Sequence, residues 1–416
     1  MLPLDQPWYR RLLGYAFVLG LAAGVLGLLY LGITGESISF VFGDPVTTTW
    51  SGQWWWIPLI GAGGVLVAYL RKAWKAPEKV PGAIDAIAAA EVDHVGAPRL
   101  VAISAVSLMV GASLGPSFAL VVMGGALGSW LAERKWAEGK ADSTYTLVGM
   151  SGGLGGAFTS PILGAFMVSE IAPTKRADYV ATIIPQMISA VIGFIMFYAI
   201  VGRTFYRAFA LPEYSFDVKD MLVAVLLGVA SVVVLLAFIA VTRLVDRVAD
   251  LVKNPYVLAG VGGGLVGLIA MALPLTIGSG NSQLAEVLEG GAQLTTVFLI
   301  VVVLAKMVAL SISIRVGFIG GNVFPMIFIG GVAGLAVHQM FPSIPVALAV
   351  SCLMAAVPGS VLKAPVSLTL LAAVSVGLGA TTTAPVIVAV ITAYVTVATV
   401  RYLMAQRAGV AEPEVA

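Results

Sequence analysis

The sequence predicts an all-α polytopic membrane protein, and two observations lead to this prediction. Of its 416 residues, 59% are hydrophobic and only 11% are charged, which is not the composition of a water-soluble domain. Long runs also contain no Asp, Glu, Lys or Arg; they cover residues 12–35, 45–70, 100–132, 143–169, 179–202, 221–242, 254–285, 316–362 and 364–400. Because a helix crosses a bilayer in about 20 residues, we expect roughly ten to fourteen membrane helices in a single transmembrane domain.

The same composition excludes other classes of protein. A net charge of only +2 leaves no basic patch, so nucleic acid is not expected as a partner. Cys352 is the single cysteine and the two histidines, His94 and His338, are far apart, so we expect no disulfide and no metal site. We find no Ser/His/Asp set and no nucleotide-binding loop, so the chain is not expected to be an enzyme, and no cofactor is expected.

The distribution of Lys and Arg between loops predicts the orientation. The loop over residues 32–52 holds Glu36 and Asp44 but no basic residue, whereas the next loop holds four, namely Arg71, Lys72, Lys75 and Lys79. Because short cytoplasmic loops carry the excess of basic residues, the N-terminus is expected to be cytoplasmic. We also expect a multi-pass protein of the cell membrane (inner or plasma membrane), with residues 401–416 as a short cytoplasmic tail.

The expected helices follow from the apolar runs and from the Gly and Pro residues that interrupt them. The first run follows Arg10 and Arg11 and is interpreted as a retained helix rather than a signal peptide, because further spans follow it. Helices are expected over residues 12–33, 53–73, 82–91, 98–112, 116–133, 144–156, 161–171, 178–201, 219–250, 255–272, 283–289, 293–315, 324–340, 345–357, 365–377 and 383–400. Many are too short to span a bilayer, which is typical of the tilted and discontinuous helices of transporters.

The two halves of the chain share a pattern of helices that begin at proline. In the first half such starts follow Gly115-Pro116 and, 45 residues later, Ser160-Pro161. In the second half they lie at Phe324-Pro325 and, 40 residues later, at Ala364-Pro365. Proline is well placed in a first helical turn, where its missing N–H would have had no partner. The pattern predicts two inverted repeats, residues 8–200 and 216–400, with a substrate site between them.

Half-helices that begin at membrane depth are suited to binding anions. Their first N–H groups lack helical partners and carry a partial positive charge. Backbone amides of residues 113–117 (Ser113, Leu114, Gly115, Pro116, Ser117) and of residues 321–324 (Gly321, Asn322, Val323, Phe324) are therefore predicted to replace the hydration shell of a small anion. Neither segment contains Lys or Arg, which favours an anion that passes over one that stays bound.

These segments resemble a known family. Residues 111–116 (Gly-Ala-Ser-Leu-Gly-Pro) and 321–325 (Gly-Asn-Val-Phe-Pro) resemble the two anion-coordinating segments of the CLC chloride channel and transporter family. Residues 156–170 resemble that family's helix with acidic residues at its cytoplasmic end, and residues 361–365 resemble its repeat partner. The resemblance implies a CLC-like inverted repeat in a homodimer within the lipid bilayer, with one pathway per subunit for chloride or a similar small anion.

Departures from the family's pattern concern its proton-carrying groups. The antiporters of the family have a glutamate directly before the Gly-Pro that matches Gly115-Pro116, and this chain has Leu114 there. At the family's inner proton position the best register places Ile171, with Glu170 one residue earlier. Glu170 then matches a neighbouring acidic position, although a slip of one residue would make it the inner proton acceptor.

Two further positions are compared with the family's anion ligands. Where many members read Gly-Ser-Gly-Ile-Pro and use the serine as a ligand, residues 77–81 read Pro-Glu-Lys-Val-Pro, so Glu78 stands in that loop. Tyr402, which we expect at the start of a last short helix, matches either the family's pathway tyrosine or an ordinary interfacial aromatic. Lys306 within an apolar helix is a functional candidate by default, with snorkelling or pairing as the alternative.

The expected function is passive, channel-like transport of small monovalent anions without proton coupling, because Leu114 can neither titrate nor compete with an anion. Two alternatives stay open. One is an anion/proton antiporter that uses another acidic residue, Glu170 or Glu78. The other is a CLC-like scaffold or anion sensor that does not transport.

Overall fold

The computed structural model describes residues 3–43, 52–135, 142–158, 160–172, 179–201, 209–290 and 293–407. Within these ranges every regular element is a helix, and the single β-type pairing is an isolated antiparallel bridge between Gly115 and Gly321. Asp44, Thr159 and residues 408–416 of the expected tail lie outside the described residues.

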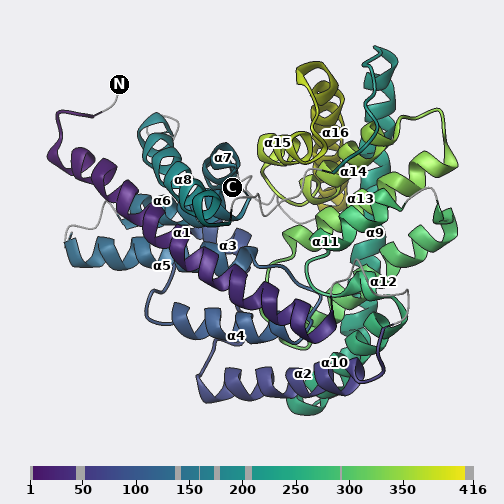
Figure 1. Cartoon of the computed structure of the whole chain (residues 1–416), viewed down its shortest axis with the longest axis horizontal. Coiled ribbons are helices and arrows are strands. Elements are labelled where there is room, and N and C mark those ends of the chain that lie inside the picture. Colours follow the sequence, from purple (N-terminus) through teal and green to yellow (C-terminus); the bar gives the residue numbers. More distant parts are fainter. Residues whose placement is uncertain are drawn as a thin grey trace. The chain divides into compact units, whose positions relative to one another are not determined.

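The helices are shown in Figure 1. They are α1 (Pro7–Phe42), α2 (Trp56–Ala73), α3 (Ala83–Ala89), α4 (Ala97–Met109), α5 (Ser117–Lys135), α6 (Asp142–Ala157), α7 (Pro161–Ile171), α8 (Tyr179–Val201), α9 (Lys219–Ala249), α10 (Pro255–Ala272), η1 (Pro274–Thr276), α11 (Asn281–Glu289), α12 (Thr296–Arg315), α13 (Val323–Met340), α14 (Val346–Gly359), α15 (Pro365–Val376) and α16 (Ala380–Arg407).

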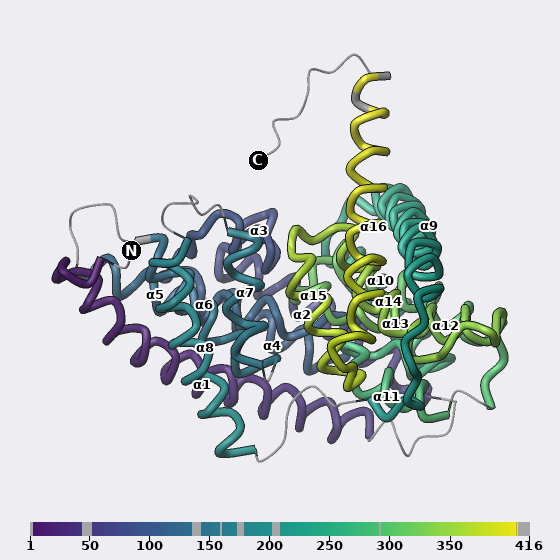
Figure 2. Tube along the Cα trace, turned by 90° about the horizontal axis from the view of Figure 1, so that it is seen from above, coloured from purple at the N-terminus to yellow at the C-terminus, as the bar shows by residue number. Residues whose placement is uncertain are grey.

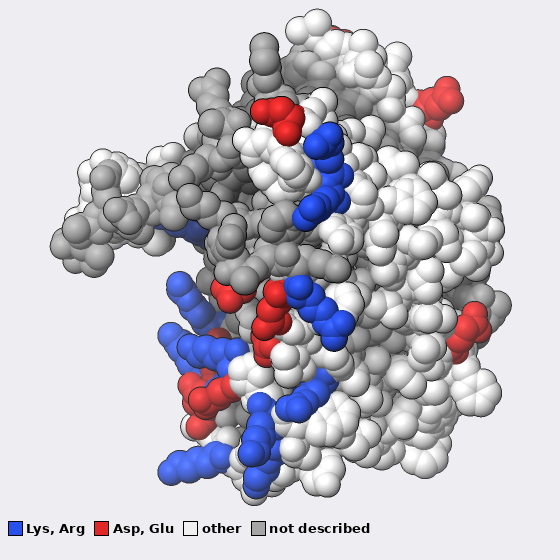
Figure 3. Space-filling model, turned by 90° about the vertical axis from the view of Figure 1, so that its left-hand side faces the viewer, with Lys and Arg blue, Asp and Glu red and all other residues white. Residues whose placement is uncertain are grey.

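Seven of the described helices are long and apolar enough to cross a membrane, namely α1, α8, α9, α10, α12, α13 and α16. Four apolar helices of 10–17 residues accompany them, namely α4, α7, α14 and α15. The predicted all-helical membrane fold with many short helices is therefore confirmed. On the face drawn in Figure 3, most charged side chains gather toward one side and the remaining surface is largely uncharged, as a lipid-facing surface requires.

The chain forms two compact units. Unit 1 comprises Met1–Arg207, Leu244–Gln283 and Val308–Pro325. Within it α1 packs against α5, α6 and α8, and α2 packs along α10 (Figure 1). Glycine allows the closest of these contacts: a Cβ atom on Gly149 of α6 would overlap the carbonyl oxygen of Gly124 on α5. Small residues that let backbones touch are the usual basis of helix packing in membranes.

Unit 2 comprises Ala208–Arg243, Leu284–Met307 and Met326–Ala416. Its central helix is α14, in which the residues from Ala347 to Gly359 are all buried. A helix that is apolar on every side belongs in a core. Helices α15 and α16 pack against α14 and against each other (Figure 2).

Two helices differ from the sequence prediction. The first helix continues past the expected end at residue 33 and stops at Phe42, where Gly43 adopts a φ of 78°. The last helix, α16, runs unbroken from Ala380 to Arg407, so the separate short helix expected to begin near Tyr402 is not formed. Residues 386–407 contain neither Gly nor Pro, so nothing in this stretch ends the helix.

The glycine contact between α5 and α6 predicts a stability difference between two substitutions. Gly149→Ala should lower the thermal unfolding midpoint in detergent, because the added methyl group overlaps backbone and overpacking costs about 1–3 kcal/mol. Gly14→Ala in α1 is the matched control, since a Cβ atom there meets nothing within 4 Å. This change should leave the midpoint unaltered or raise it, because alanine favours helix by about 1 kcal/mol. Equal midpoints for the two variants would contradict the packing described here.

Candidate anion site

Two loops that are distant in sequence meet through their backbones in unit 1. The Gly115 N–H donates to the Gly321 carbonyl over 2.7 Å, and the Gly321 N–H donates to the Gly115 carbonyl over 2.7 Å. The loops can approach this closely because both residues lack side chains: a Cβ atom on Gly321 would overlap the hydroxyl of Ser117. The bridge therefore joins one half-helix start from each predicted repeat.

Two helices begin directly after this bridge, α5 at Ser117 and α13 at Val323. In α5 the first ladder bond runs from the Leu120 N–H to the Pro116 carbonyl over 3.2 Å, so the N–H groups of residues 117–119 precede the helical ladder. The positive ends of two helix dipoles are thereby held side by side. Such an arrangement is suited to an anion, as the sequence predicts.

Several amides predicted to face an anion are instead bonded within the protein. The Ser113 N–H donates to the Ser313 hydroxyl over 3.1 Å, and the Ser113 hydroxyl donates to the Thr276 carbonyl over 3.0 Å. The Leu114 N–H donates to the Ala112 carbonyl over 2.7 Å, and the Gly115 N–H is used in the bridge. Pro116 has no N–H. Of the backbone N–H groups predicted to bind an anion within residues 113–117, the Ser117 N–H is the one that makes no hydrogen bond to another described residue. The bonds of the preceding residues hold the loop rigid.

The side chains around the bridge are apolar and fully buried. Leu114 is 1% exposed and packs over Gly320, where an added Cβ atom would lie 3.2 Å from the Leu114 Cδ1. Phe158, which directly follows α6, stacks on Phe324 in the first turn of α13 with ring centroids 5.3 Å apart. No titratable side chain is present from residue 100 to residue 132, so none can take the place of Leu114 beside the bridge from this part of the chain.

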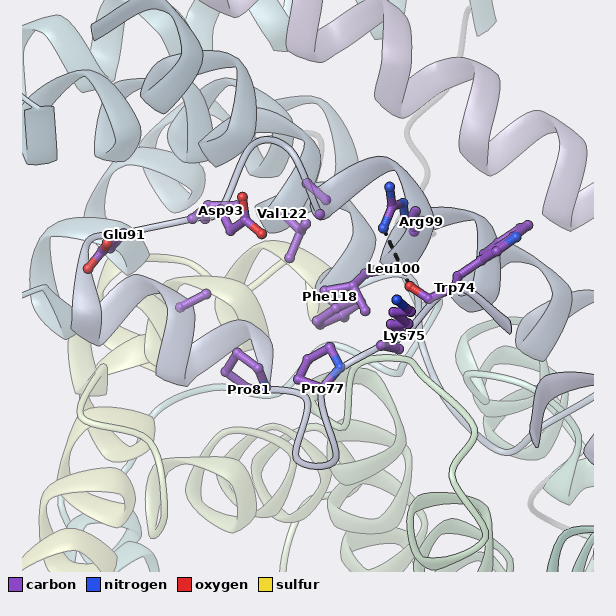
Figure 4. Close-up of a pocket in the computed structure, with 15 residues that line it drawn as sticks. Trp74, Lys75, Pro77, Pro81, Glu91, Asp93, Arg99, Leu100, Phe118 and Val122 are labelled. Atoms are coloured by element: carbon purple, nitrogen blue, oxygen red, sulfur yellow. Dashed lines mark hydrogen bonds between the residues drawn. The ribbon is translucent and has the colours of Figure 1, made fainter. Parts of the chain in front are cut away.

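A cavity of about 260 Å³ reaches the first turns of α5 in unit 1 (Figure 4). Phe118 and Val122 of α5 line its apolar part, whereas Lys75 and Arg99 supply basic groups and Glu91 and Asp93 acidic ones. Arg99 also donates through Nη1 to the Trp74 carbonyl over 3.5 Å. The cavity thus connects a charged rim with the helix whose N-terminus forms half of the candidate site.

Arg71 holds two loops of the site together, a role that sequence reasoning did not find. Its Nη1 donates to the Gly317 carbonyl over 3.1 Å, in the loop that leads to α13. Its Nη2 donates to the carbonyls of Pro77 and Glu78 over 3.2 and 2.9 Å. Gly317 has a φ of 97°, a backbone conformation that favours glycine, and a Cβ atom there would lie 2.6 Å from the Arg71 Nη1 and displace the guanidinium. From the sequence, Arg71 contributed only to the loop's positive charge.

The predicted acidic residues lie elsewhere in unit 1. Glu78 is exposed, and its backbone carbonyl is one of the acceptors of Arg71. Glu170 is half-buried in the last turn of α7, beside Ser169 and Ile171. The Ser169 hydroxyl donates to the Gln186 side-chain oxygen over 2.6 Å, so Glu170 stands next to a buried polar pair. Neither carboxylate belongs to the loops that form the bridge.

Two candidate residues belong to unit 2. Tyr402 is half-exposed on α16, and its hydroxyl accepts a hydrogen bond from the Gln406 Nε2 over 2.7 Å. Lys306 on α12 is fully buried rather than snorkelling, and its Nζ lies 5.3 Å from the ring centroid of Phe328 on α13. A cation over an aromatic ring is an electrostatically favourable pair.

Comparison with known proteins supports the resemblance seen in the sequence. The model of the family described as "Voltage gated chloride channel" matches residues 63–398. A protein of Escherichia coli O7:K1 named "Putative ion-transport protein YfeO" is 25% identical over 304 residues, which are 72% of this chain and 71% of that protein. An uncharacterized protein of Methanocaldococcus jannaschii is 30% identical over 190 residues, and this match spans about half of each protein, 45% of this chain and 47% of the other.

Two solved structures share the fold. The crystal structure of a slow cyanobacterial Cl⁻/H⁺ antiporter has a TM-score of 0.79 at 20% identity and covers 94% of this chain and 95% of its own. The crystal structure of a CLC-type fluoride/proton antiporter has a TM-score of 0.75 at 17% identity, with 93% and 95% covered. Since the family model matches most of the chain, this multi-pass membrane protein belongs to the voltage-gated chloride channel (CLC) family, whose members transport anions and are not enzymes.

Proposed function

We propose that the protein carries small monovalent anions such as chloride passively across the membrane, without moving protons in exchange. The observation that carries this proposal is the residue beside the bridge. Leu114 packs between the two half-helix starts, where coupled exchange requires a group that binds a proton and competes with the anion. A leucine does neither, so anion and proton movements have no shared group at this point.

The pathway begins, in this proposal, at the cavity that Phe118 lines. Lys75 and Arg99 at its rim attract anions locally, at the end of the cavity away from Glu91 and Asp93 (Figure 4). The N–H groups at the starts of α5 and α13 then replace water around the anion. Because Leu114, Phe158 and Phe324 are each at most 2% exposed, the described conformation is closed by apolar groups and flux requires one of them to move.

Proton-coupled exchange is a second candidate, supported by a specific observation at Glu170. This carboxylate follows Ser169, whose hydroxyl is bonded to the buried Gln186, so a titratable group adjoins a buried polar pair. The two structures that share the fold are titled as proton antiporters. At 17–20% identity this likeness concerns the fold. Glu78 is less suited, because it is exposed in a loop tied down by Arg71.

A scaffold or anion sensor that does not transport is the third candidate. The closed apolar packing of Leu114 against Gly320 and of Phe158 against Phe324 favours it, since apolar side chains that fill a pathway block the passage of ions. We further propose a homodimer with one pathway per subunit in the cell membrane. The basic loop around Arg71 favours a cytoplasmic N-terminus, and Arg401 and Arg407 favour a cytoplasmic C-terminus.

The first prediction of this proposal concerns coupling. Purified protein in liposomes should dissipate a chloride gradient, and under opposed chloride and proton gradients its reversal potential should follow chloride alone. The reason is that no titratable side chain occupies position 114. Empty liposomes provide the control. A reversal potential shifted by the proton gradient would refute passive transport, and chloride binding without flux at any voltage or pH would favour the sensor.

The second prediction tests whether Leu114 lies on the pathway. Leu114→Glu should slow anion flux at neutral pH and make it rise on acidification, because a charged carboxylate competes with the anion and a protonated one does not. Leu114→Gln is the matched control, being of similar size and polar but unable to titrate. Its flux should show no such pH dependence. Unchanged flux in both variants would remove Leu114 from the pathway.

The third prediction tests the orientation. Glu36→Cys and Lys75→Cys occupy exposed positions and should react with a membrane-impermeant maleimide from opposite sides, with Lys75→Cys protected in intact cells. The native Cys352 is 0% exposed and should stay unlabelled, so it serves as an internal control. Labelling of both introduced cysteines from the same side would show that the proposed topology is wrong.

A further inference from the structure

We propose that the side-chain hydroxyl of Ser117 is a direct ligand of the transported anion and sets its chemical selectivity. This inference rests on the proposed anion transport and adds to it a specific hydrogen-bond donor. The helix starts alone offer only backbone N–H groups, which every residue type provides. A side chain at the same place can be changed, and it therefore distinguishes this protein's site from a generic helix N-terminus.

The first observation is that the Ser117 hydroxyl lacks a partner. Ser117 is 2% exposed, and its Oγ has no hydrogen-bond partner among the described residues. The buried serines Ser113 and Ser231 are bonded, to backbone carbonyls over 3.0 and 2.7 Å. Ser189, on α8, shares the unpaired state of Ser117 but lies away from the bridge and from both helix starts. Burying a hydroxyl without a partner is unfavourable. An unpaired donor here costs stability unless a ligand pairs with it.

The second observation is the direction in which this hydroxyl points. A Cβ atom built on Gly321 would overlap the Ser117 Oγ and lie 3.1 Å from the Phe118 nitrogen. The hydroxyl is therefore directed at the bridge, between the starts of α5 and α13. No Lys, Arg, Asp or Glu belongs to residues 113–119 or 320–325, so the two helix dipoles determine the sign of the local potential.

These two observations define the chemistry of the missing partner. The hydroxyl needs an acceptor, and the positive helix ends favour a negatively charged one and repel a cation. A halide satisfies both conditions with a single atom. When the apolar closure by Leu114 and Phe324 opens, the anion would accept one hydrogen bond from the Ser117 Oγ in addition to those from backbone N–H groups.

A hydroxyl ligand has a consequence for selectivity. Small anions such as chloride accept strong hydrogen bonds, whereas large, weakly hydrated anions such as thiocyanate accept weak ones. Ser117 should therefore favour chloride over thiocyanate. Removing the hydroxyl should weaken chloride binding and shift the preference toward thiocyanate, because only the backbone amides then remain as donors.

The test compares three full-length proteins: wild type, Ser117→Ala and Ser129→Ala. Ser129 is the matched control, since it lies 12 residues further along the same helix, about 18 Å away. Its hydroxyl is bonded to the Thr146 hydroxyl over 2.8 Å. Chloride affinity is measured by titration calorimetry, relative chloride and thiocyanate fluxes in liposomes, and thermal midpoints in detergent without any permeant anion.

For Ser117→Ala we expect chloride affinity about tenfold lower or more, because hydrogen bonds to charged groups are the stronger kind, and a flux ratio shifted toward thiocyanate. Its midpoint without anion should equal or exceed that of wild type, since an unpaired buried hydroxyl is removed. Ser129→Ala should show the opposite pattern, with a lower midpoint and unchanged affinity and selectivity. Ser117→Cys, which keeps a weak S–H donor, should be intermediate in affinity.

If Ser117→Ala has the same chloride affinity and the same flux ratio as wild type, the proposed role of Ser117 is wrong, and the proposed anion transport is unaffected. A lower midpoint for Ser117→Ala without anion would overturn it as well, because the hydroxyl would then be stabilising the protein by itself. If wild type neither binds nor passes chloride, the proposed function fails too, so the two failures are distinguishable.

Discussion

The pair of backbone hydrogen bonds between Gly115 and Gly321 is the constraint on which the candidate site depends. It unites loops that are far apart in the chain and fixes where α5 and α13 begin relative to each other within unit 1. Neighbouring bonds reinforce it from both sides: Ser113 is tied to Ser313 and Thr276, and Arg71 is tied to Gly317 in the loop before α13. The amides beyond the bridge need no side chain to orient them.

The distribution of charge around the site follows from the cost of burying ions. An ionised side chain at membrane depth is expensive, so such groups lie at the rim of the cavity, as Lys75 and Arg99 do. Arg71 comes closer but directs its guanidinium at three backbone carbonyls. What remains at the bridge are partial charges of backbone and hydroxyl. Partial charges hold an anion weakly enough to release it, which a lysine would do less readily.

Sequence patterns that act locally predicted most of the fold. Proline at a first helical position located the starts of α7 and α15 at Pro161 and Pro365, because that signal is carried by the residue itself. The site was predicted only in part. Two half-helix starts were identified, but the bonds that occupy the Ser113 and Leu114 amides depend on partners that no local pattern shows. The partners of Arg71 and the unpaired hydroxyl of Ser117 are likewise products of tertiary packing.

The bridge also determines where the protein can be re-engineered. Gly115 and Gly321 contribute only backbone to it, and at Gly321 even a methyl group would overlap Ser117. Neither residue has a side chain whose replacement could alter ion selectivity, and a larger residue at either position would push the two helix starts apart. A mutant library designed to change ion preference should therefore keep both glycines and randomise positions 114, 117 and 324, whose side chains border the bridge without forming it.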